Sequence, residues 1–223
     1  MLYIESQERS HIDRVTQNTA NEIKTLLEED IRKRMASLTE FSELSEASNM
    51  SDDEWDLLSS ALYYSQQGYH SIVWVDGLNH VRRIMPIEGD ETSIEFDLAL
   101  QPPLFGESNA QALNSAVKTV LLDSKSGKLG LGIFVPVFNK NLNNKKVDGY
   151  MVGVLLLDFY IKSVIPAYLT TEHKLTLFIN EQIVYTDQIN HSSVINKWNK
   201  QSFFKIGRQQ WQINMCLTIN FNH

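Results

Sequence analysis

The chain has 223 residues, and its 20 basic and 27 acidic side chains give a net charge of −7. With 43% hydrophobic and 21% charged residues, the composition is globular, with enough chain for one large domain or two small ones. The acidic balance argues against binding to nucleic acid or to an anionic membrane surface, because both would repel the chain. A single cysteine, Cys216, excludes an internal disulfide framework and a cysteine-based zinc site.

A long amino-terminal helix is the first predicted element. Residues 1–60 hold no glycine and no proline and carry a net charge of −8, whereas the rest of the chain carries +1. Apolar residues recur at steps of three and four, with an interruption around residues 18–22. So long a pattern indicates a stalk, a helical dimer or a spine packed on its own domain. The apolar positions are Ile12, Val15, Ile23, Leu26, Leu27, Ile31, Met35, Leu38, Phe41 and Leu44.

A second helix is predicted to begin at a capping box formed by Ser51 and Glu54. The acidic residues at this point suit the positive end of the helix dipole. Gly68 supplies a stop. These carboxylates therefore indicate a helix start rather than an acid/base pair.

Beyond Gly68 the chain changes to a strand pattern, broken by two further helices. One helix is predicted from about Ser108, with Ala112, Leu113, Ala116, Val117 and Val120 on its buried face, and a short one over 158–165. Runs of antiparallel strands broken by helices predict an α+β fold, and the strands fall into two groups that divide near residue 166. The predicted strands are 71–75 with 80–84, 129–138 beside 148–159, 174–179 with 182–186, and 202–206 with 209–221. The first hairpin turns at Asp76 to Asn79 and the third pair at Asn180 and Glu181. The strands 129–138 and 148–159 are expected to be central in one antiparallel sheet.

Catalytic signatures are missing from the sequence. It has no phosphate-binding glycine loop, no nucleophile elbow and no two histidines at metal-ligand spacing. We therefore predict no cofactor, no metal and no catalysis by this segment. A soluble cytosolic enzyme remains the least favoured alternative.

A binding site has better support. Arg82 and Arg83 are adjacent in a strand, so they point to opposite sides, and an arginine in a pocket can hold a carboxylate by two hydrogen bonds. A surface salt bridge is its more frequent role. Trp74, Phe134 and Phe138 lie on predicted strands and are candidates to line a pocket, although core packing is the commoner fate of such residues.

Several motifs, taken together, resemble the CHASE domain, the extracytoplasmic sensory domain of transmembrane receptors. The resemblance covers about residues 40 to 220, and the front helix corresponds to the family's stalk. Its motifs are GYHSIVWVDG at 68–77 with VRRIMP at 81–86, LGIFVPVF at 131–138, GYMVGVLLLD at 149–158, LFINEQIVY at 177–185 and IGRQQW at 206–211. The region of Glu107 and Ser108 departs from the acidic anchor with which plant members bind cytokinins, so cytokinin binding is not carried over.

The resemblance implies a long N-terminal stalk helix followed by two PAS-like antiparallel-sheet subdomains. The expected limits are a stalk helix at 1–48, a membrane-distal ligand-binding subdomain at 49–166 and a membrane-proximal subdomain at 167–223. It also implies a periplasmic location, with transmembrane helices flanking this segment. The downstream output would be a diguanylate cyclase, a phosphodiesterase or a histidine kinase, the first two belonging to c-di-GMP signalling.

The preferred hypothesis is a small-molecule sensor that acts as a homodimer through its stalk helix and binds no nucleic acid. The ligand is expected on the sheet of 71–85, 129–138 and 149–158, under residues 97–121. Its candidate contacts are Trp74, Arg82, Asp97, Phe134 and Met151. The alternative is a structural dimerisation module of a membrane receptor, whose first subdomain is filled by its own side chains and binds no small molecule.

Overall fold

The computed structural model describes residues 2–48, 50–78, 80–86, 118–123, 127–138, 147–171, 173–187, 199–207 and 209–217. Asp97 and the predicted helical residues 108–117 lie outside these ranges. Within the described part of the chain, no helix has the length and apolar character needed to span a bilayer.

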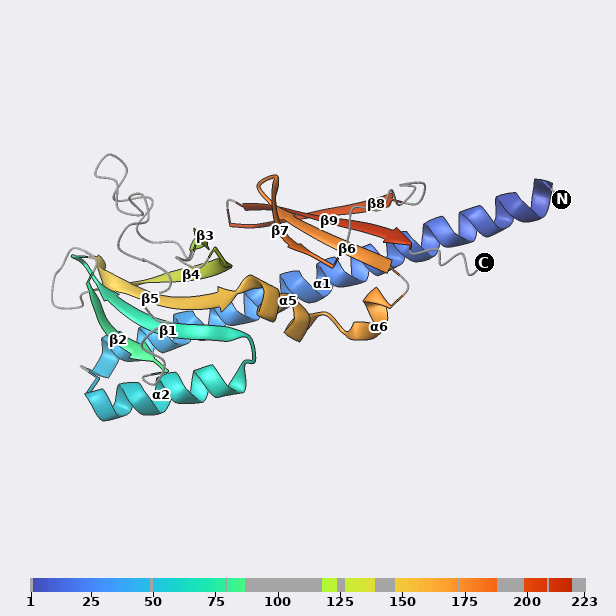
Figure 1. Cartoon of the computed structure of the whole chain (residues 1–223). Helices are drawn as coiled ribbons and strands as arrows, with labels where there is room; N and C mark the ends of the chain where they lie inside the picture. Colours follow the sequence, from blue (N-terminus) through green and yellow to red (C-terminus); the bar gives the residue numbers. More distant parts are fainter. Residues whose placement is uncertain are drawn as a thin grey trace. The chain divides into compact units, whose positions relative to one another are not determined.

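Two helices open the chain, as predicted (Figure 1). Helix α1, Leu2–Ser48, is continuous through residues 18–22, where only its apolar pattern breaks. Helix α2, Asp52–Ser65, begins at the predicted capping box. The Glu54 carboxylate accepts the Ser51 backbone N–H at 2.9 Å, and the Ser51 hydroxyl accepts the Glu54 N–H at 3.3 Å. The bond from the Ser51 backbone lowers the pKa of Glu54.

The first sheet is antiparallel, with strand order β2-β1-β5-β4-β3. The two strands predicted to be central, β4 and β5, are paired along their length, and β5 lies in the middle of the sheet. The described pairing of β3 with β4 begins at Lys118 and Phe134, and Pro136 lies outside it. The five strands are β1 Tyr69–Asp76, β2 Val81–Met85, β3 Lys118–Asp123, β4 Leu129–Phe138 and β5 Val147–Leu156.

The second sheet is also antiparallel, with strand order β7-β6-β9-β8. Its first hairpin turns at Asn180 and Glu181, whose φ angles of 48° and 71° suit the two central positions of a type I′ turn. Helices α5, Leu157–Val164, and α6, Ala167–Thr170, precede it in the chain. The four strands are β6 His173–Ile179, β7 Gln182–Thr186, β8 Asn199–Ile206 and β9 Gln209–Leu217. A long helix followed by two antiparallel sheets is the predicted α+β architecture.

Two predicted boundaries are wrong. The helix expected to reach residue 121 is a strand from Lys118 onward, and Val120 pairs with Gly132 of β4. The strand expected to run to residue 159 ends at Leu156, and α5 begins at Leu157. Short apolar runs fit a buried strand and a helix equally well, so partner strands decide between them.

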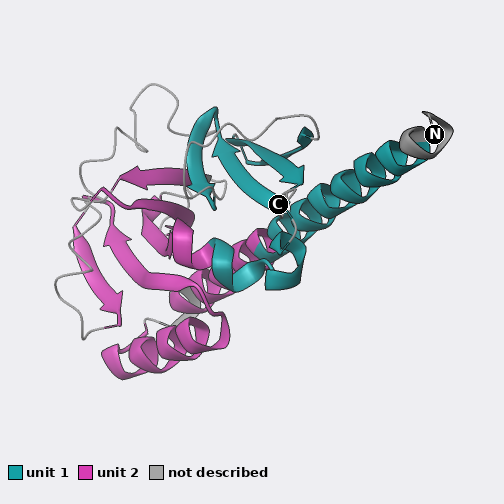
Figure 2. Ribbon diagram, turned by 45° about the vertical axis from the view of Figure 1, so that its right-hand side comes forward, with its two compact units in different colours: residues 1–30, 161–223 teal, residues 31–160 magenta. Residues whose placement is uncertain are grey.

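The chain divides into two compact units, residues 1–30 with 161–223 and residues 31–160 (Figure 2). Helix α1 contributes to both units rather than forming a third. The domain boundaries expected at residues 48 and 166 stay predictions.

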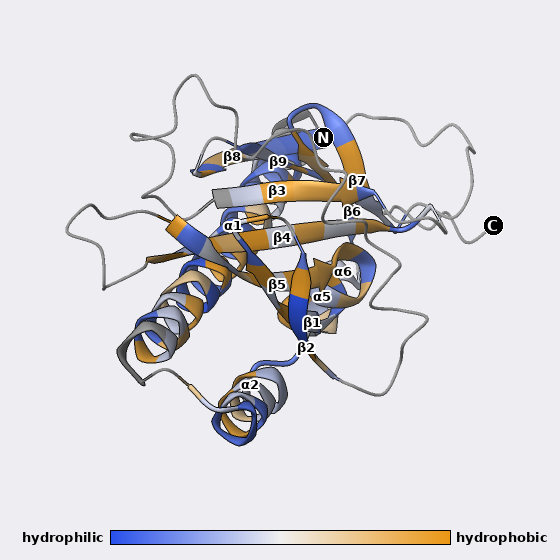
Figure 3. Ribbon diagram, turned by 90° about the vertical axis from the view of Figure 1, so that its left-hand side faces the viewer, coloured by the Kyte–Doolittle hydropathy of each residue, from blue (hydrophilic) through white to orange (hydrophobic). Residues whose placement is uncertain are grey.

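In the unit of residues 31–160, α1 and α2 pack on one face of the first sheet. A Cβ added to Gly153 on β5 would lie 2.7 Å from Leu38 of α1 and 2.7 Å from the Tyr69 ring, so only glycine fits between sheet and helix. The rings of Phe41 and Trp55, from α1 and α2, lie 5.0 Å apart. Strands β4 and β5 are among the most apolar segments of the chain (Figure 3).

In the other unit, the start of α1 meets the second sheet partly through polar groups. The Ser202 hydroxyl donates to the Asn21 side chain at 3.0 Å, and Lys200 pairs with Asp13 at 2.9 Å. Thr16 lies 3.3 Å from the His173 ring. Asn21 lies within the interruption of the apolar pattern at residues 18–22, and its bond to Ser202 gives a polar side chain a role there.

Candidate functional site

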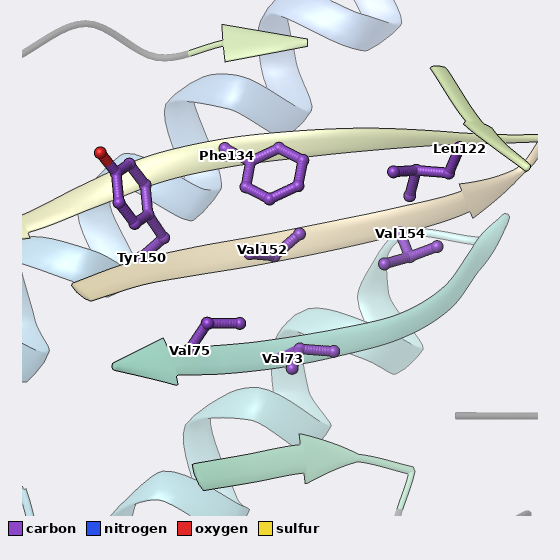
Figure 4. Close-up of a cluster of buried hydrophobic side chains, with 7 residues drawn as sticks. All are labelled: Val73, Val75, Leu122, Phe134, Tyr150, Val152 and Val154. Atoms are coloured by element: carbon purple, nitrogen blue, oxygen red, sulfur yellow. The ribbon is translucent and has the colours of Figure 1, made fainter. Parts of the chain in front are cut away.

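The first sheet has a second face, opposite to α1 and α2, on which seven buried apolar side chains form a cluster (Figure 4). The cluster draws on four strands, and alternation along each strand places its members on the same side. We call this set the floor cluster: Val73, Val75, Leu122, Phe134, Tyr150, Val152 and Val154.

The aromatic pair of the floor cluster has a defined geometry. The rings of Phe134 and Tyr150 lie 6.5 Å apart at 72°, an edge-to-face contact. Gly132 makes room for Phe134, because a Cβ at this position would lie 2.6 Å from the Phe134 ring and 3.1 Å from Leu122. Burial raises the pKa of the Tyr150 hydroxyl, so this group stays a neutral hydrogen-bonding group near neutral pH.

A polar cluster closes the β1–β2 hairpin around Asp76. Its carboxylate accepts the backbone N–H groups of Leu78 and His80 at 2.9 Å each, and the Arg82 Nε–H at 2.6 Å. The bond from the His80 backbone, with those from Arg82 and Leu78, lowers the pKa of Asp76 to about 2. Trp74 pairs with Arg83 and Val75 with Val81, so Arg82 is the extra residue of a β-bulge.

The Asp76 carboxylate makes the stability of this hairpin depend on pH. A folded-state pKa of about 2, below the ordinary value of 3.8, means that the contribution is complete only well above pH 3.8 and is lost as the pH falls through about 2. We expect the stability difference between wild type and Asp76→Asn to shrink steadily from about pH 5 to about pH 2. Urea unfolding at each pH measures it, with exposed Asp123→Asn as the control. A difference that stays constant over this range would contradict the assignment.

Arg83, next to Arg82, lies in a different environment. Its guanidinium lies 5.7 Å from the Trp55 ring centroid and 5.5 Å from that of Trp74. It also pairs with Asp52 at 2.6 Å and donates to the Met50 carbonyl. Arg83 therefore ties the start of α2 to the sheet by cation–π stacking and charge, and its role is structural.

The predicted contact residues separate into three places. Trp74 and Met151 are paired neighbours on the helix-covered face, where Met151 is fully buried. Phe134 lies in the floor cluster on the opposite face, and Arg82 is half-exposed at the hairpin end. Asp97 lies outside the described residues. A ligand seated on one face of this sheet therefore cannot touch both Phe134 and the Trp74–Met151 pair.

Sequence reasoning missed two residues of this region. Tyr150 is not among the candidate contacts, although it pairs with Pro136, which is two residues along β4 from Phe134. Asp76 was treated only as a turn residue, yet it holds Arg82. The Asp-Gly turn followed by a basic strand was the available signal for that pair.

Metal and thiol chemistry find no support in the described ranges. No group of three or more histidine, cysteine, aspartate or glutamate side chains gathers there. Cys216 is buried in β9, and burial raises the pKa of its thiol. A raised pKa leaves little reactive thiolate at neutral pH.

Comparison with known proteins identifies the fold but not a family. No family model matches the chain, and a search of curated proteins finds no match. The resemblance to the CHASE domain therefore stays a prediction.

Solved structures of sensory domains are similar to most of the chain. An extracellular ligand-binding receptor from Desulfohalobium retbaense has a TM-score of 0.61 at 14% identity, over 90% of this chain but only 39% of its own. The periplasmic sensory domain of the Campylobacter jejuni chemoreceptor Tlp1 has a TM-score of 0.56 at 9% identity, over 95% of both chains. The ligand-binding domain of the Pseudomonas aeruginosa amino acid chemoreceptor PctC, in complex with GABA, has a TM-score of 0.56 at 11% identity, over 93% of this chain and 98% of its own. The chain has the fold of these sensory and ligand-binding domains.

Proposed function

We propose that this chain is the extracytoplasmic sensor domain of a bacterial transmembrane receptor and that it does no chemistry itself. One observation supports this best: the helix and both sheets follow the order of solved periplasmic sensory domains over at least nine-tenths of the chain. The output domain would be a diguanylate cyclase, a phosphodiesterase or a histidine kinase. The full-length gene tests this proposal, which requires apolar segments of about twenty residues on both sides.

A small molecule is proposed to bind over the floor cluster in the unit of residues 31–160. Phe134 and Tyr150 would contact its body, and Arg82 at the hairpin end would hold a carboxylate. Asp97 stays a proposed contact, whereas Trp74 and Met151 would support the site from the opposite face. Binding changes signalling only if the ligand has different affinities for two receptor states.

A thermal-shift screen of small metabolites, with GABA and L-amino acids included, tests the ligand proposal. A hit at 100 times its dissociation constant stabilises the protein by about 2.7 kcal/mol. We expect Phe134→Ala to weaken binding at least about tenfold, and Arg82→Gln to do so for carboxylate ligands.

Two further variants keep this test interpretable. Phe134→Leu roughly preserves volume and covers the case in which Phe134→Ala fails to fold. Leu57→Ser, on the exposed side of α2, is the matched control that should leave binding unchanged. Hits that survive both Phe134→Leu and Arg82→Gln unchanged would place the ligand elsewhere.

A structural module without a ligand is the second candidate. The observation in its favour is that every side chain of the floor cluster is at most 4% exposed. In this case no metabolite shifts the melting temperature, and the floor cluster serves only as core.

Dimerisation through α1 is proposed for the whole receptor. Ile23, Leu27, Ile31 and Leu38, which suggested a partner helix in the sequence, are fully buried within this chain. Over residues 7–45 of α1, whose side chains the structure describes, the exposed side is largely polar, with Val15 and Leu44 as exposed large apolar residues. We therefore expect the isolated chain to sediment as a monomer at micromolar concentration. A stable dimer in sedimentation velocity would show that this polar side associates without membrane segments.

A further inference from the structure

The start of α1 contacts strand β8 through a series of polar bonds. Three side chains of α1 take part, and they are four residues apart, so they lie one above another on the same side of the helix. Their partners are three consecutive residues of β8. We call these six residues the polar seam: Asp13 with Lys200 at 2.9 Å, Gln17 with the Gln201 carbonyl at 3.3 Å, and Asn21 with the Ser202 hydroxyl at 3.0 Å.

The alternation of β8 explains why both side chains and backbone take part in the polar seam. Lys200 and Ser202 point to the same side of the strand, toward α1, whereas the side chain of Gln201 points to the other side and its backbone carbonyl makes the bond. Gln17 donates to this carbonyl and also to the Asn21 side chain at 3.2 Å. The polar seam therefore continues from residue 13 to residue 21, over about two turns of α1.

The side chains buried beside the polar seam are small or polar. Thr16 and Ala20 are each 0% exposed, and Thr16 lies 3.3 Å from the His173 ring. Among the described side chains of α1, large apolar ones are fully buried only from Ile23 onward, with Leu27 as the next. Since hydrophobic stabilisation follows the apolar area removed from water, residues 13–21 contribute less to the docking of α1 than the residues that follow.

Water and salt reach the polar seam. The side chains of Asp13 and Lys200 are 43% and 29% exposed, and Asn21 is exposed. An ion pair in such surroundings is screened by salt and contributes little net free energy. Water can also replace the hydrogen bonds between α1 and β8, because the exchange of protein partners for water partners is nearly balanced. The polar seam therefore holds the start of α1 on the second sheet only weakly.

We propose that residues 7–22 of α1 separate from the second sheet in a local opening, while the rest of α1 and the sheet stay folded. Proteins open locally where few apolar groups are buried. The open segment can stay helical, because it continues from a packed helix and needs no new nucleus. In the receptor proposed above, a ligand or partner that favours the closed or the open form would shift this equilibrium. That use in signalling, unlike the opening itself, rests on the proposed function.

Thiol labelling at Ala20 tests this proposal. Ala20→Cys, in a Cys216→Ser background, places a thiol under the start of α1. Ser42→Cys, in the same background, places one farther along the helix, where Ser42 is 1% exposed. The native Cys216 thiol, buried in β9, reports opening of the second sheet itself. After division by the rate in the unfolded chain, we expect Ala20→Cys to react with a water-soluble maleimide at least about tenfold faster than Ser42→Cys or the native Cys216.

Substitutions in the polar seam connect the opening to these bonds. Asp13→Asn and Gln17→Ala should each speed the labelling of Ala20→Cys by about two- to fivefold. A rise in salt from about 20 mM to about 500 mM should speed the labelling of Ala20→Cys alone but not of its combination with Asp13→Asn. Asn18→Ala, at the exposed position next to Gln17, is the matched control and should change the rate by less than about 1.5-fold.

Equal rates for Ala20→Cys and Ser42→Cys would overturn the proposal, because the start of α1 would then be docked as firmly as its later part. The proposal is also overturned if native Cys216 reacts as fast as Ala20→Cys, since the whole second sheet would then open. Unchanged rates in both the Asp13 and the Gln17 variants would overturn it as well. Thr16→Cys, at a second fully buried position, repeats the test if Ala20→Cys lowers the melting temperature. None of these outcomes bears on the flanking segments that test the proposed function.

Discussion

We expect Arg34→Ala to lower the free energy of unfolding of the unit of residues 31–160 by about 3–5 kcal/mol. Arg34 is on α1, is 3% exposed, and donates to the backbone carbonyls of Gln66 and Gln67. These carbonyls follow the end of α2, where the helix itself offers them no donor. The guanidinium also lies 4.9 Å from the Tyr69 ring centroid and 5.2 Å from that of Tyr160. Truncation removes the donor to both carbonyls and leaves a cavity beside the two rings.

Two variants distinguish this specific role from a general effect of charge. Arg34→Lys should recover only part of the loss, because a single ammonium cannot bond both carbonyls and stack flat between two rings. Lys33→Ala, on the adjacent exposed position, should change stability by less than about 0.5 kcal/mol. Hydrogen exchange of β1 and β5 amides in urea measures the stability of this unit separately. An Arg34→Ala loss no larger than that of Lys33→Ala would contradict the contact.

Truncation of Trp211 is expected to have an effect of similar size in the other unit. Trp211, on β9, is fully buried, and its ring lies 5.4 Å from the Phe204 ring in a stacked arrangement. Removal of a buried aromatic ring to alanine costs about 3–5 kcal/mol. Hydrogen exchange of β6 and β9 amides should report this loss, while β1 and β5 amides should be less affected.

Trp211→Phe should cost far less, about 1 kcal/mol or below. The Trp211 indole N–H is buried without a hydrogen-bond acceptor among the described residues, so the smaller ring removes an unsatisfied donor as well as some packing. A loss for Trp211→Phe as large as that for Trp211→Ala would show that the indole N–H has an acceptor.

Local sequence signals predicted the elements well where one residue type fixes the backbone. Ser51 and Glu54 marked the start of α2 because each satisfies a donor that the helix leaves open. Asn180 and Glu181 marked the β6–β7 turn, which requires two positive φ angles. The very apolar runs of β4 and β5 predicted central strands, because a strand covered on both faces has no polar side.

The candidate site was less predictable, because face and pairing depend on strands far apart in the sequence. Because Arg82 and Arg83 are adjacent on a strand, the sequence predicted different surroundings for their side chains. Only the structure shows that Arg82 donates a hydrogen bond to Asp76 and that Arg83 lies over the rings of Trp55 and Trp74. Trp74 and Phe134 looked equivalent as strand aromatics. The register of β1 and β4 against β5 places them on opposite faces.

The use of the long helix also required the tertiary structure. Its apolar stripe predicted that the helix packs against a partner surface. The stripe did not show whether this surface is a second helix or the chain's own sheets, since hydrophobic burial is not directional. In the structure Ile23 and Leu38 are buried within the chain, and Asn21 bonds Ser202 where the stripe breaks.

By itself the sequence determined the long helix, the turn positions, the two groups of strands and the lack of catalytic motifs, because periodicity, capping and turn chemistry act over a few residues. Only the tertiary structure decided that 118–123 is a strand and which sheet face holds each candidate residue. Strand register is set by the packing of a whole face, and a shift of one residue exchanges its two sides.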